Sequence, residues 1–293
     1  MTYPVLPTLL PGDAVGIVAC SNALNLQQVI EAKQLLAVLE SMPLRPVCSD
    51  SLLSAPDAPE RSPRRRAEQL LQLYADPEVK AIFDLSGGDL ANEILPFLDY
   101  ELIRRNPKPF WGYSDLTTVL NALLQKSGCR SVLYQLRNLV KENGETQRQL
   151  FGSTAFYGKN DLWDINWKFL QGSRMHGKVI GGNLRCLLKL AGTPYFPDCD
   201  GNLLFLESLG GGPELVTTHL CQLKQMGVFS RISGLLLGTF TMLEQQIGTD
   251  AASSMIGSVV GCRELPIAKT QQIGHAPDSK ALLIGSEYGI GEE

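Results

Sequence analysis

A serine at the junction of a predicted strand and a predicted helix is the strongest candidate for chemistry in this chain. The apolar run from Pro109 to Tyr113 contains Gly112, and Ser114 follows it at the start of a helix predicted over 116–126. A strand–turn–helix of this kind lifts the serine oxygen away from the backbone and sets it beside free amide N–H groups. Those amides would stabilise negative charge that develops on a carbonyl under attack. The pattern therefore fits a nucleophilic serine.

The same serine also has a plainer interpretation as a helix cap. Serine is among the best N-cap residues, and Asp115 in the first turn suits the helix dipole. The Gly-x-Ser-x-Gly motif of an ordinary α/β-hydrolase elbow is missing, because Leu116 stands where the second glycine would be. Local sequence alone favours the cap.

Three histidines limit the choice of a general base. His176 lies beside Gly177 in a polar segment, where we expect it to be exposed. His219 falls in the middle of a helix, where a helix-face or core role is expected. His275 follows Gly274 at the end of a predicted strand and opens a loop, and such loops on rigid flanks often carry a base. Local sequence leaves a base and an ordinary loop residue equally open at His275.

Glu207 is the strongest candidate for an acid that orients the base. It ends the apolar run 203–206 and precedes the three glycines 210–212, so its carboxylate must be solvated, paired or used. A strand-end glutamate that simply reaches water remains open. Glu214, at a helix start, and Glu244, in a polar loop, are weaker alternatives.

Composition excludes several classes of function. The 293 residues suffice for two domains, and 44% hydrophobic and 19% charged residues are values of a globular chain. The net charge of −4 argues against a nucleic-acid partner. No apolar run approaches the ~20 residues that span a bilayer, and the start lacks a basic signal region, so we expect a cytoplasmic protein without a membrane partner. The seven cysteines include no Cys-x-x-Cys pair and are expected to be reduced.

Motifs for nucleotides and metals are also missing. The chain has no Gly-x-Gly-x-x-Gly, no Walker-A loop, no His-Glu-x-x-His and no Cys/His cluster at metal spacing. We therefore expect neither a cofactor nor a metal.

The first half of the chain alternates between strand and helix signals. Apolar runs at 14–20, 81–85, 110–113 and 131–134 predict buried strands separated by helical patterns. Such alternation predicts a parallel sheet covered on both faces, with functional loops at the carboxyl ends of the strands. Ser114 and the pair Gly87-Gly88 fall at such ends. The one basic run, Arg64 to Arg66, opens a helix, and we expect a solvated helix end rather than an anion site.

The second half of the chain has a different pattern of predicted elements. Residues 137–176 show weak periodicity and are expected to form a connecting segment that packs on the surface. Short strands at 178–181, 203–206, 234–240 and 281–284, with helices near 184–191 and 213–226, then predict a smaller domain with a mixed or barrel-like sheet. The predicted division is 1–140, 141–176 and 177–293.

Taken together, these segments resemble the serine LD-carboxypeptidase family, which includes the microcin C immunity peptidases. The matching segments are 10–13, 76–82, 87–88, 92–103, 106–109, 112–117, 180–184, 192–194, 204–207 and 274–275. Each is short, but their order and spacing make the combination specific.

The resemblance implies a role for each candidate residue. Ser114 would be the nucleophile, His275 the general acid/base and Glu207 the acid that orients the imidazole. The backbone N–H groups of Gly88 and Asp115 would form the oxyanion hole. The implied fold is α/β, with a flavodoxin- or Rossmann-like N-terminal domain that carries the serine and a second domain that carries the other two residues.

The resemblance also implies a substrate class. The scissile amide would join an L-configured centre to a terminal D-amino acid, as in a muropeptide tetrapeptide, or an aminoacyl group to a modified nucleotide. We expect Gly87, Asp89, Asn183 and Glu214 to bind that substrate, and we expect a homodimer, as is common in the family. A non-catalytic protein that binds small molecules is the alternative from a different class, which an intact set of candidate catalytic residues argues against.

Some positions depart from the family pattern. Ala91 stands where a serine is usual, Gln135-Leu136 replaces a glycine–proline pair, and Arg185 replaces a small or apolar residue. The C-terminal piece at 281–285 lacks the usual proline. These departures bear on the pocket and so on the substrate. Asp89 favours the immunity type, whose members carry an acid there.

Overall fold

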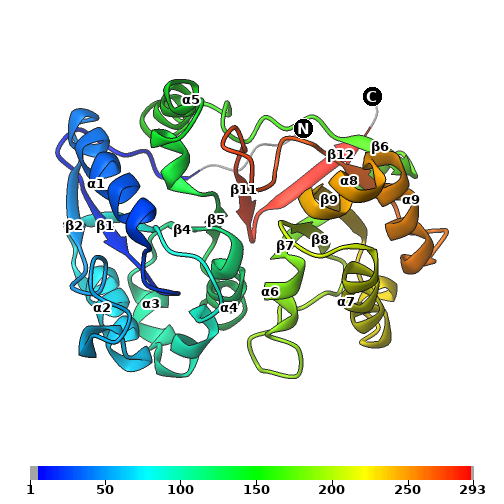
Figure 1. The fold of residues 1–293 in the computed structure, drawn as a ribbon, viewed down its shortest axis with the longest axis horizontal. Coiled ribbons are helices and arrows are strands. Elements are labelled where there is room, and N and C mark those ends of the chain that lie inside the picture. Colours follow the sequence, from blue (N-terminus) through cyan, green and yellow to red (C-terminus); the bar gives the residue numbers. More distant parts are fainter. Residues whose placement is uncertain (1–5, 292–293) are drawn as a thin grey trace.

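Two six-stranded sheets organise the chain in the computed structural model, which describes residues 6–291. The first sheet and its helices form the left-hand lobe of Figure 1, and the second sheet and its helices form the right-hand lobe. The expected α/β class with two different sheets is confirmed. No helix in the described part of the chain is both long and apolar enough to cross a bilayer.

The first sheet is parallel except at one edge. Its order is β2-β1-β3-β4-β5-β11, and only β11 runs antiparallel to its neighbour. The order 2-1-3-4-5 is that of the flavodoxin-like folds, as predicted. The strands are β1 (Ala14–Val18), β2 (Arg45–Cys48), β3 (Val79–Asp84), β4 (Phe110–Gly112), β5 (Ser131–Leu133) and β11 (Leu282–Ile284).

The position of β11 corrects one expectation. The sequence pattern predicted the strand at 281–284 correctly but assigned it to the second sheet, whereas it pairs with β5 of the first. Its three residues are fully buried and cover an edge of β5 that would otherwise be open. The division into 1–140, 141–176 and 177–293 remains a prediction. The strand β11 belongs to the third of these segments in sequence but pairs with a strand of the first.

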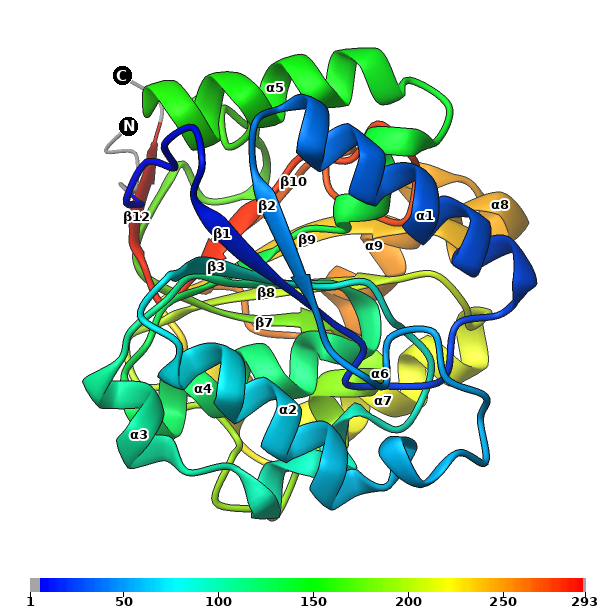
Figure 2. The same cartoon turned by 90° about the vertical axis from the view of Figure 1, so that its left-hand side faces the viewer.

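Helices cover both faces of the first sheet. Figure 2 shows α1 and α5 on one face and α2, α3 and α4 on the other. The helices are α1 (Leu26–Ser41), α2 (Pro63–Ala75), α3 (Tyr100–Arg105), α4 (Thr117–Ser127) and α5 (Gly144–Tyr157). The core under α1 and α5 contains Phe83, Trp111 and Phe151, whose rings contact one another.

The basic run at the start of α2 is not wholly solvated, contrary to expectation. Arg64 and Arg65 are exposed, but Arg66 is only 1% exposed. Its guanidinium donates to the carbonyls of Cys20 and Leu90 and pairs with Glu93. Arg66 is buried because it satisfies backbone carbonyls in the loops after β1 and β3, next to the predicted site.

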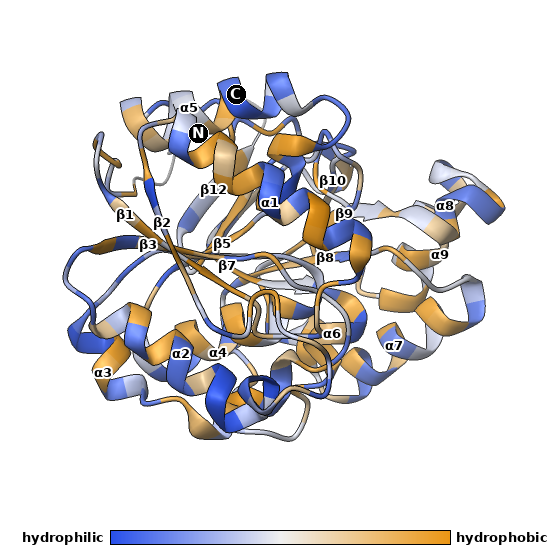
Figure 3. Ribbon diagram, turned by 60° about the vertical axis from the view of Figure 1, so that its left-hand side comes forward, coloured by the Kyte–Doolittle hydropathy of each residue, from blue (hydrophilic) through white to orange (hydrophobic). Residues whose placement is uncertain are grey.

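The second sheet is mixed and curls into a half-barrel. Its order is β12-β7-β8-β9-β10-β6, with antiparallel strands at both edges. The strands are β6 (Lys168–Gln171), β7 (Arg174–Asn183), β8 (Leu203–Ser208), β9 (Gly234–Phe240), β10 (Ile267–Lys269) and β12 (Glu287–Gly291). Four helices pack on its outer face: α6 (Leu184–Leu188), α7 (Pro213–Gln225), α8 (Thr241–Ile247) and α9 (Thr249–Val260). In Figure 3 hydrophobic residues dominate the strands, and the helices alternate in hydropathy.

The segment 141–176 links the two sheets. It contains α5, which covers the first sheet, and β6, which pairs with β10 of the second. Its weak periodicity did not predict either element, because the buried side of α5 includes polar Gln147 and Thr154 beside Phe151.

A seam of hydrogen bonds joins α4 of the first sheet to β7 of the second. Asn121 donates to the carbonyl of Gly181 at 2.8 Å and accepts from its N–H at 2.9 Å. One turn earlier, Thr117 Oγ1 accepts from the N–H of Asn183 at 2.9 Å. Since α4 begins just after Ser114 and β7 ends at Asn183, this seam fixes the serine relative to the second sheet.

Candidate active site

Ser114 lies at a sharp turn between β4 and α4. The strand ends at Gly112, and residues Ser114–Leu116 form a 3₁₀ turn that leads into the helix. A Cβ on Gly112 would lie 2.7 Å from Leu116 Cβ, so the tightness of the turn requires glycine there. Ser114 itself has a φ of 56°, a left-handed conformation that a non-glycine residue adopts only under constraint. Strain of this kind is what a nucleophile elbow shows.

His275 is delivered to Ser114 by the loop after β10. Its Nε2 lies 3.1 Å from Ser114 Oγ, within hydrogen-bond distance although the residues are 161 positions apart. The preceding Gly274 has no room for a side chain, because a Cβ would overlap Thr239 Oγ1 at 1.7 Å. The ring of Tyr113 meets the imidazole edge-on, with centroids 4.8 Å apart. These contacts fix the plane of the imidazole.

Glu207 reaches the other imidazole nitrogen from β8. Its Oε2 lies 2.8 Å from His275 Nδ1, and its side chain is completely buried. These two atoms are close but are not aligned as a hydrogen bond, and neither of them has a hydrogen-bond partner among the described residues. Catalytic hydrogen bonds often align only around bound substrate. Asn183 Nδ2 donates to the second oxygen, Oε1, at 2.9 Å and so orients the carboxylate.

Tyr113 is a further buried neighbour of this carboxylate. Burial, and then the charge of the nearby Glu207, raise the pKa of Tyr113 well above its ordinary value. The phenol therefore stays neutral beside the carboxylate. Tyr113 was not singled out from the sequence, where it reads as the last apolar residue of a strand.

The carboxylate of Asp115 ties together the loops that surround Ser114. It is fully buried and accepts from Ser21 Oγ at 2.6 Å, from the N–H of Ala91 at 2.8 Å and from Lys189 Nζ at 2.5 Å. Lys189 also donates to the carbonyl of Asp89 at 2.9 Å. The loop of Gly88 and the turn of Ser114 are thereby held at a fixed separation. Nothing in the sequence around Lys189 distinguishes it from a solvated helix-end lysine.

Gly88 has a conformation that suits it to this loop. Its φ is 122°, and a Cβ there would lie 2.4 Å from Asn22 Cγ. Asn22 is itself held, since its Oδ1 accepts from the N–H of Asp89 at 2.9 Å. Gly87 and Gly88 line the same cavity as Ser114 and His275.

Two cavities meet at Ser114. One, of about 430 Å³, lies between α1, the segment after β5 and the His275 loop. The other, of about 560 Å³, lies between α6, the loop after β8 and α8, and its wall includes Leu209, Leu215 and Met242. His275 lines the first cavity but not the second.

The remaining predicted substrate residues take different places. Asp89 is 59% exposed at the rim and forms an ion pair with Arg185, whose hydrogen bond lowers the pKa of Asp89. Asn183 lines the larger cavity and also holds Glu207. Glu214 is exposed in the first turn of α7 and lines neither cavity at Ser114.

The other two histidines lie apart from the imidazole contact. His176 is 74% exposed, as expected. His219 is half-buried on α7 and lines the 560 Å³ cavity, and burial lowers its pKa.

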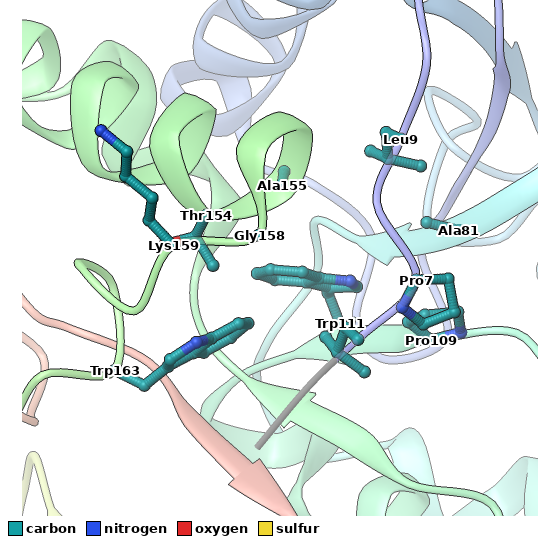
Figure 4. Close-up of a pocket in the computed structure, with 11 residues that line it drawn as sticks. Pro7, Leu9, Ala81, Pro109, Trp111, Thr154, Ala155, Gly158, Lys159 and Trp163 are labelled. Atoms are coloured by element: carbon teal, nitrogen blue, oxygen red, sulfur yellow. The ribbon is translucent and has the colours of Figure 1, made fainter. Parts of the chain in front are cut away.

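A separate small cavity lies under α5 (Figure 4). It holds only about 20 Å³ and is lined by residues that include Pro109, Trp111, Lys159 and Trp163. A space of this size takes about one water molecule, so it is a packing defect and not a ligand site.

Comparison with known proteins identifies the two halves of the chain. Residues 15–134 match the family model for the LD-carboxypeptidase N-terminal domain, and residues 176–290 match that for the LD-carboxypeptidase C-terminal domain. A probable murein peptide carboxypeptidase of Bacillus subtilis is 27% identical over 289 residues, which cover 95% of this chain and 89% of that protein.

Two further relatives have solved structures. Microcin C7 self-immunity protein MccF of Escherichia coli is 25% identical over 263 residues, covering 78% of this chain and 75% of that protein. A structure of MccF with glutamyl sulfamoyl guanosine aligns with a TM-score of 0.86 at 20% identity, over 99% of this chain and 98% of that one. Muramoyltetrapeptide carboxypeptidase from Oxalobacter formigenes aligns with a TM-score of 0.76 at 22% identity, over 96% and 95%. The chain therefore belongs to the LD-carboxypeptidase family and is a serine peptidase.

Proposed function

We propose that the protein is an LD-carboxypeptidase that removes a terminal D-amino acid from a muropeptide-type tetrapeptide, with Ser114, His275 and Glu207 as its catalytic triad. The observation that carries the proposal is the continuous contact of Ser114 Oγ with Nε2 at 3.1 Å and of Nδ1 with Glu207 Oε2 at 2.8 Å. The name of the Bacillus subtilis relative supports a murein peptide as substrate.

The proposed reaction is an acyl transfer to the serine followed by hydrolysis. His275 Nε2 takes the proton of Ser114 as Oγ attacks the amide carbonyl, and the N–H groups of Gly88 and Asp115 stabilise the oxyanion. His275 then returns the proton to the leaving amine, and the C–N bond breaks. Water repeats the sequence on the acyl-enzyme. Glu207 keeps the proton on Nδ1 and stabilises the imidazolium throughout.

Product masses test this proposal directly. The protein is incubated in parallel with a disaccharide tetrapeptide and with an aminoacyl sulfamoyl adenosine. We expect loss of the terminal D-amino acid from the tetrapeptide and no loss with Ser114→Ala. Full turnover by Ser114→Ala would remove that serine from the mechanism.

A second candidate function is that of an immunity-type peptidase that cleaves an aminoacyl–nucleotide antibiotic. The sequence and structural likeness to MccF favours it, together with the acid at position 89, which pairs with Arg185 at the rim of the site. Cleavage of the sulfamoyl adenosine without cleavage of the tetrapeptide would select this function.

A further inference from the structure

The 430 Å³ cavity beside Ser114 carries positive charge that the triad does not use. Apart from His275, its charged lining residues in the described chain are Arg137 and Lys141, and no carboxylate lines it. Both cations lie in the segment after β5, which begins at the departure Gln135-Leu136 from the family pattern.

Arg137 is held in place by hydrogen bonds to α1 and to Gln135. It is 7% exposed, and its NH1 donates to Glu31 of α1 at 2.9 Å while its Nε donates to Gln135 Oε1 at 3.4 Å. Glu31 therefore neutralises Arg137 and fixes it against α1. The guanidinium retains NH2 as a donor group without a partner among the described residues.

Lys141 carries the positive charge of this cavity that no ion pair among the described residues neutralises. It follows the 3₁₀ turn Leu136–Val140, is half-buried, and forms no ion pair with any described residue. Burial, and then the neighbouring Arg137, lower its pKa, while the charge of Glu31 acts in the opposite direction. A half-buried ammonium in a cavity without carboxylates is a ready partner for an anion.

The position of the histidine indicates which part of a substrate enters this cavity. His275 must protonate the leaving amine, so the leaving group lies on the side of Ser114 that His275 lines. That side is the 430 Å³ cavity, which both Ser114 and His275 line. The 560 Å³ cavity contains Ser114 but not His275, and a third cavity of about 390 Å³ contains His275 but not Ser114. The volume is within the roughly 300–1,000 Å³ of small-molecule sites.

We propose that Lys141, supported by Arg137, binds the free terminal carboxylate of the leaving amino acid and so makes the enzyme a carboxypeptidase. The inference rests on the proposed function and extends it to the recognition of the chain end. The cation of the other cavity, Arg185, is already paired with Asp89 and is less available to a substrate carboxylate.

The test compares a disaccharide tetrapeptide with the same molecule carrying a C-terminal amide. The wild type should prefer the acid in kcat/KM by about 10- to 100-fold, the range for a charge-assisted contact. Lys141→Met should lose this preference through KM for the acid, with kcat and amide turnover retained. Lys126→Met, which removes an exposed lysine at the far end of α4, should keep the wild-type preference.

A binding measurement separates this inference from the proposed function. In the Ser114→Ala background the acid should bind more tightly than the amide by calorimetry, and Lys141→Met should abolish the difference. If the wild type cleaves acid and amide equally well, or if Lys141→Met keeps the preference, the inference is overturned while the carboxypeptidase reaction stands. If no peptide is cleaved, the proposed function fails, and an acid-over-amide difference in binding that depends on Lys141 still supports the anion site. Equal binding of both forms overturns it.

Discussion

Both oxygens of the Glu207 carboxylate have a close neighbour, since Oε2 lies 2.8 Å from His275 Nδ1 and Oε1 accepts a hydrogen bond from Asn183 Nδ2. In the proposed triad, this buried carboxylate would select the imidazole tautomer that has its proton on Nδ1 and its lone pair directed at Ser114. Asn183, expected to bind substrate, therefore has a positioning role as well, and it caps the start of α6 through Cys186 N.

Replacement of this carboxylate is the sharpest test at the residue scale. Glu207→Gln keeps the shape but donates an N–H toward Nδ1, so the wrong tautomer is favoured and kcat should fall about 10⁴-fold. Glu214→Gln is the matched control, since Glu214 is exposed and lines neither cavity at Ser114. Steady-state kinetics measure both. A large loss in Glu214→Gln with a small loss in Glu207→Gln would reverse the assignment.

The candidate residues were predictable from the sequence to different degrees. The turn at Ser114 has a local signal in Gly112 and the helix that follows. His275 and Glu207 have almost none, because a loop histidine and a strand-end glutamate are common. The family resemblance assigns their roles, and their contact with Ser114 depends on packing between two sheets. Tyr113 and Lys189 had no usable signal, since their roles arise from neighbours distant in sequence.

At the scale of elements, the conformation of the loop after β3 depends on Gly88. Gly88→Ala should displace the loop, because its φ of 122° is strained for alanine and its Cβ would meet Asn22. If its N–H serves the oxyanion, kcat should fall about 10²–10³-fold. Gly257→Ala, on α9 and outside the cavities at Ser114, is the control, because its Cβ would also meet nothing within 4 Å. Equal kcat for Gly88→Ala and wild type would exclude this amide from the oxyanion hole.

The ion pair between α8 and β10 gives a second prediction at this scale. Lys269 Nζ lies 2.6 Å from Glu244 Oε1, with exposures of 7% and 11%. Glu244→Gln leaves the lysine without its charge partner and should lower the free energy of unfolding by about 3–5 kcal/mol. Chemical denaturation at neutral pH measures this loss. An unchanged free energy of unfolding would show that the pair contributes nothing.

The pH dependence of that stability has a definite sign. Burial by itself would raise the pKa of Glu244, but the hydrogen bonds from Lys269 and from Phe240 N lower it overall. The ionised form therefore contributes stability above the ordinary value of 4.5, and the contribution is lost as the pH falls through the folded pKa. The difference between wild type and Glu244→Gln should shrink from about pH 6 to about pH 3. A constant difference would contradict the assignment to this carboxyl.

The elements show what periodicity can and cannot predict. Buried strands such as β1 and β8 contain continuous apolar runs, and their predicted ends lie within two residues of the observed ones. The helix α5 was missed because polar side chains share its buried face. The buried position of Arg66 was also missed, since its partners are carbonyls of loops that sequence does not place beside it.

At the scale of the whole molecule, the seam between α4 and β7 brings the serine and the carboxylate together. Asn121→Ala would leave the N–H and C=O of Gly181 unpaired in a buried place. We expect the free energy of unfolding to fall by about 2–4 kcal/mol and kcat to fall with it. Asn106→Ala, at the end of α3, loses one local bond and should cost about 1 kcal/mol. Unchanged kcat in a destabilised Asn121→Ala would show that the seam supports the fold only.

The fold of the first half was predictable from its alternating strand and helix signals, and that of the second half from its short apolar runs. The way in which the halves meet was not predictable. The last predicted strand joined the first sheet because an open edge of β5 was available there. The homodimer expected from the resemblance remains a prediction.

The central claim is that residues from two sheets activate one alcohol, and a serine-directed fluorophosphonate tests it without knowledge of the substrate. Intact mass and peptide mapping should find a single adduct, on Ser114, and His275→Ala should slow its formation by orders of magnitude. Labelling of another serine, or an equal rate of labelling in His275→Ala, would contradict the claim.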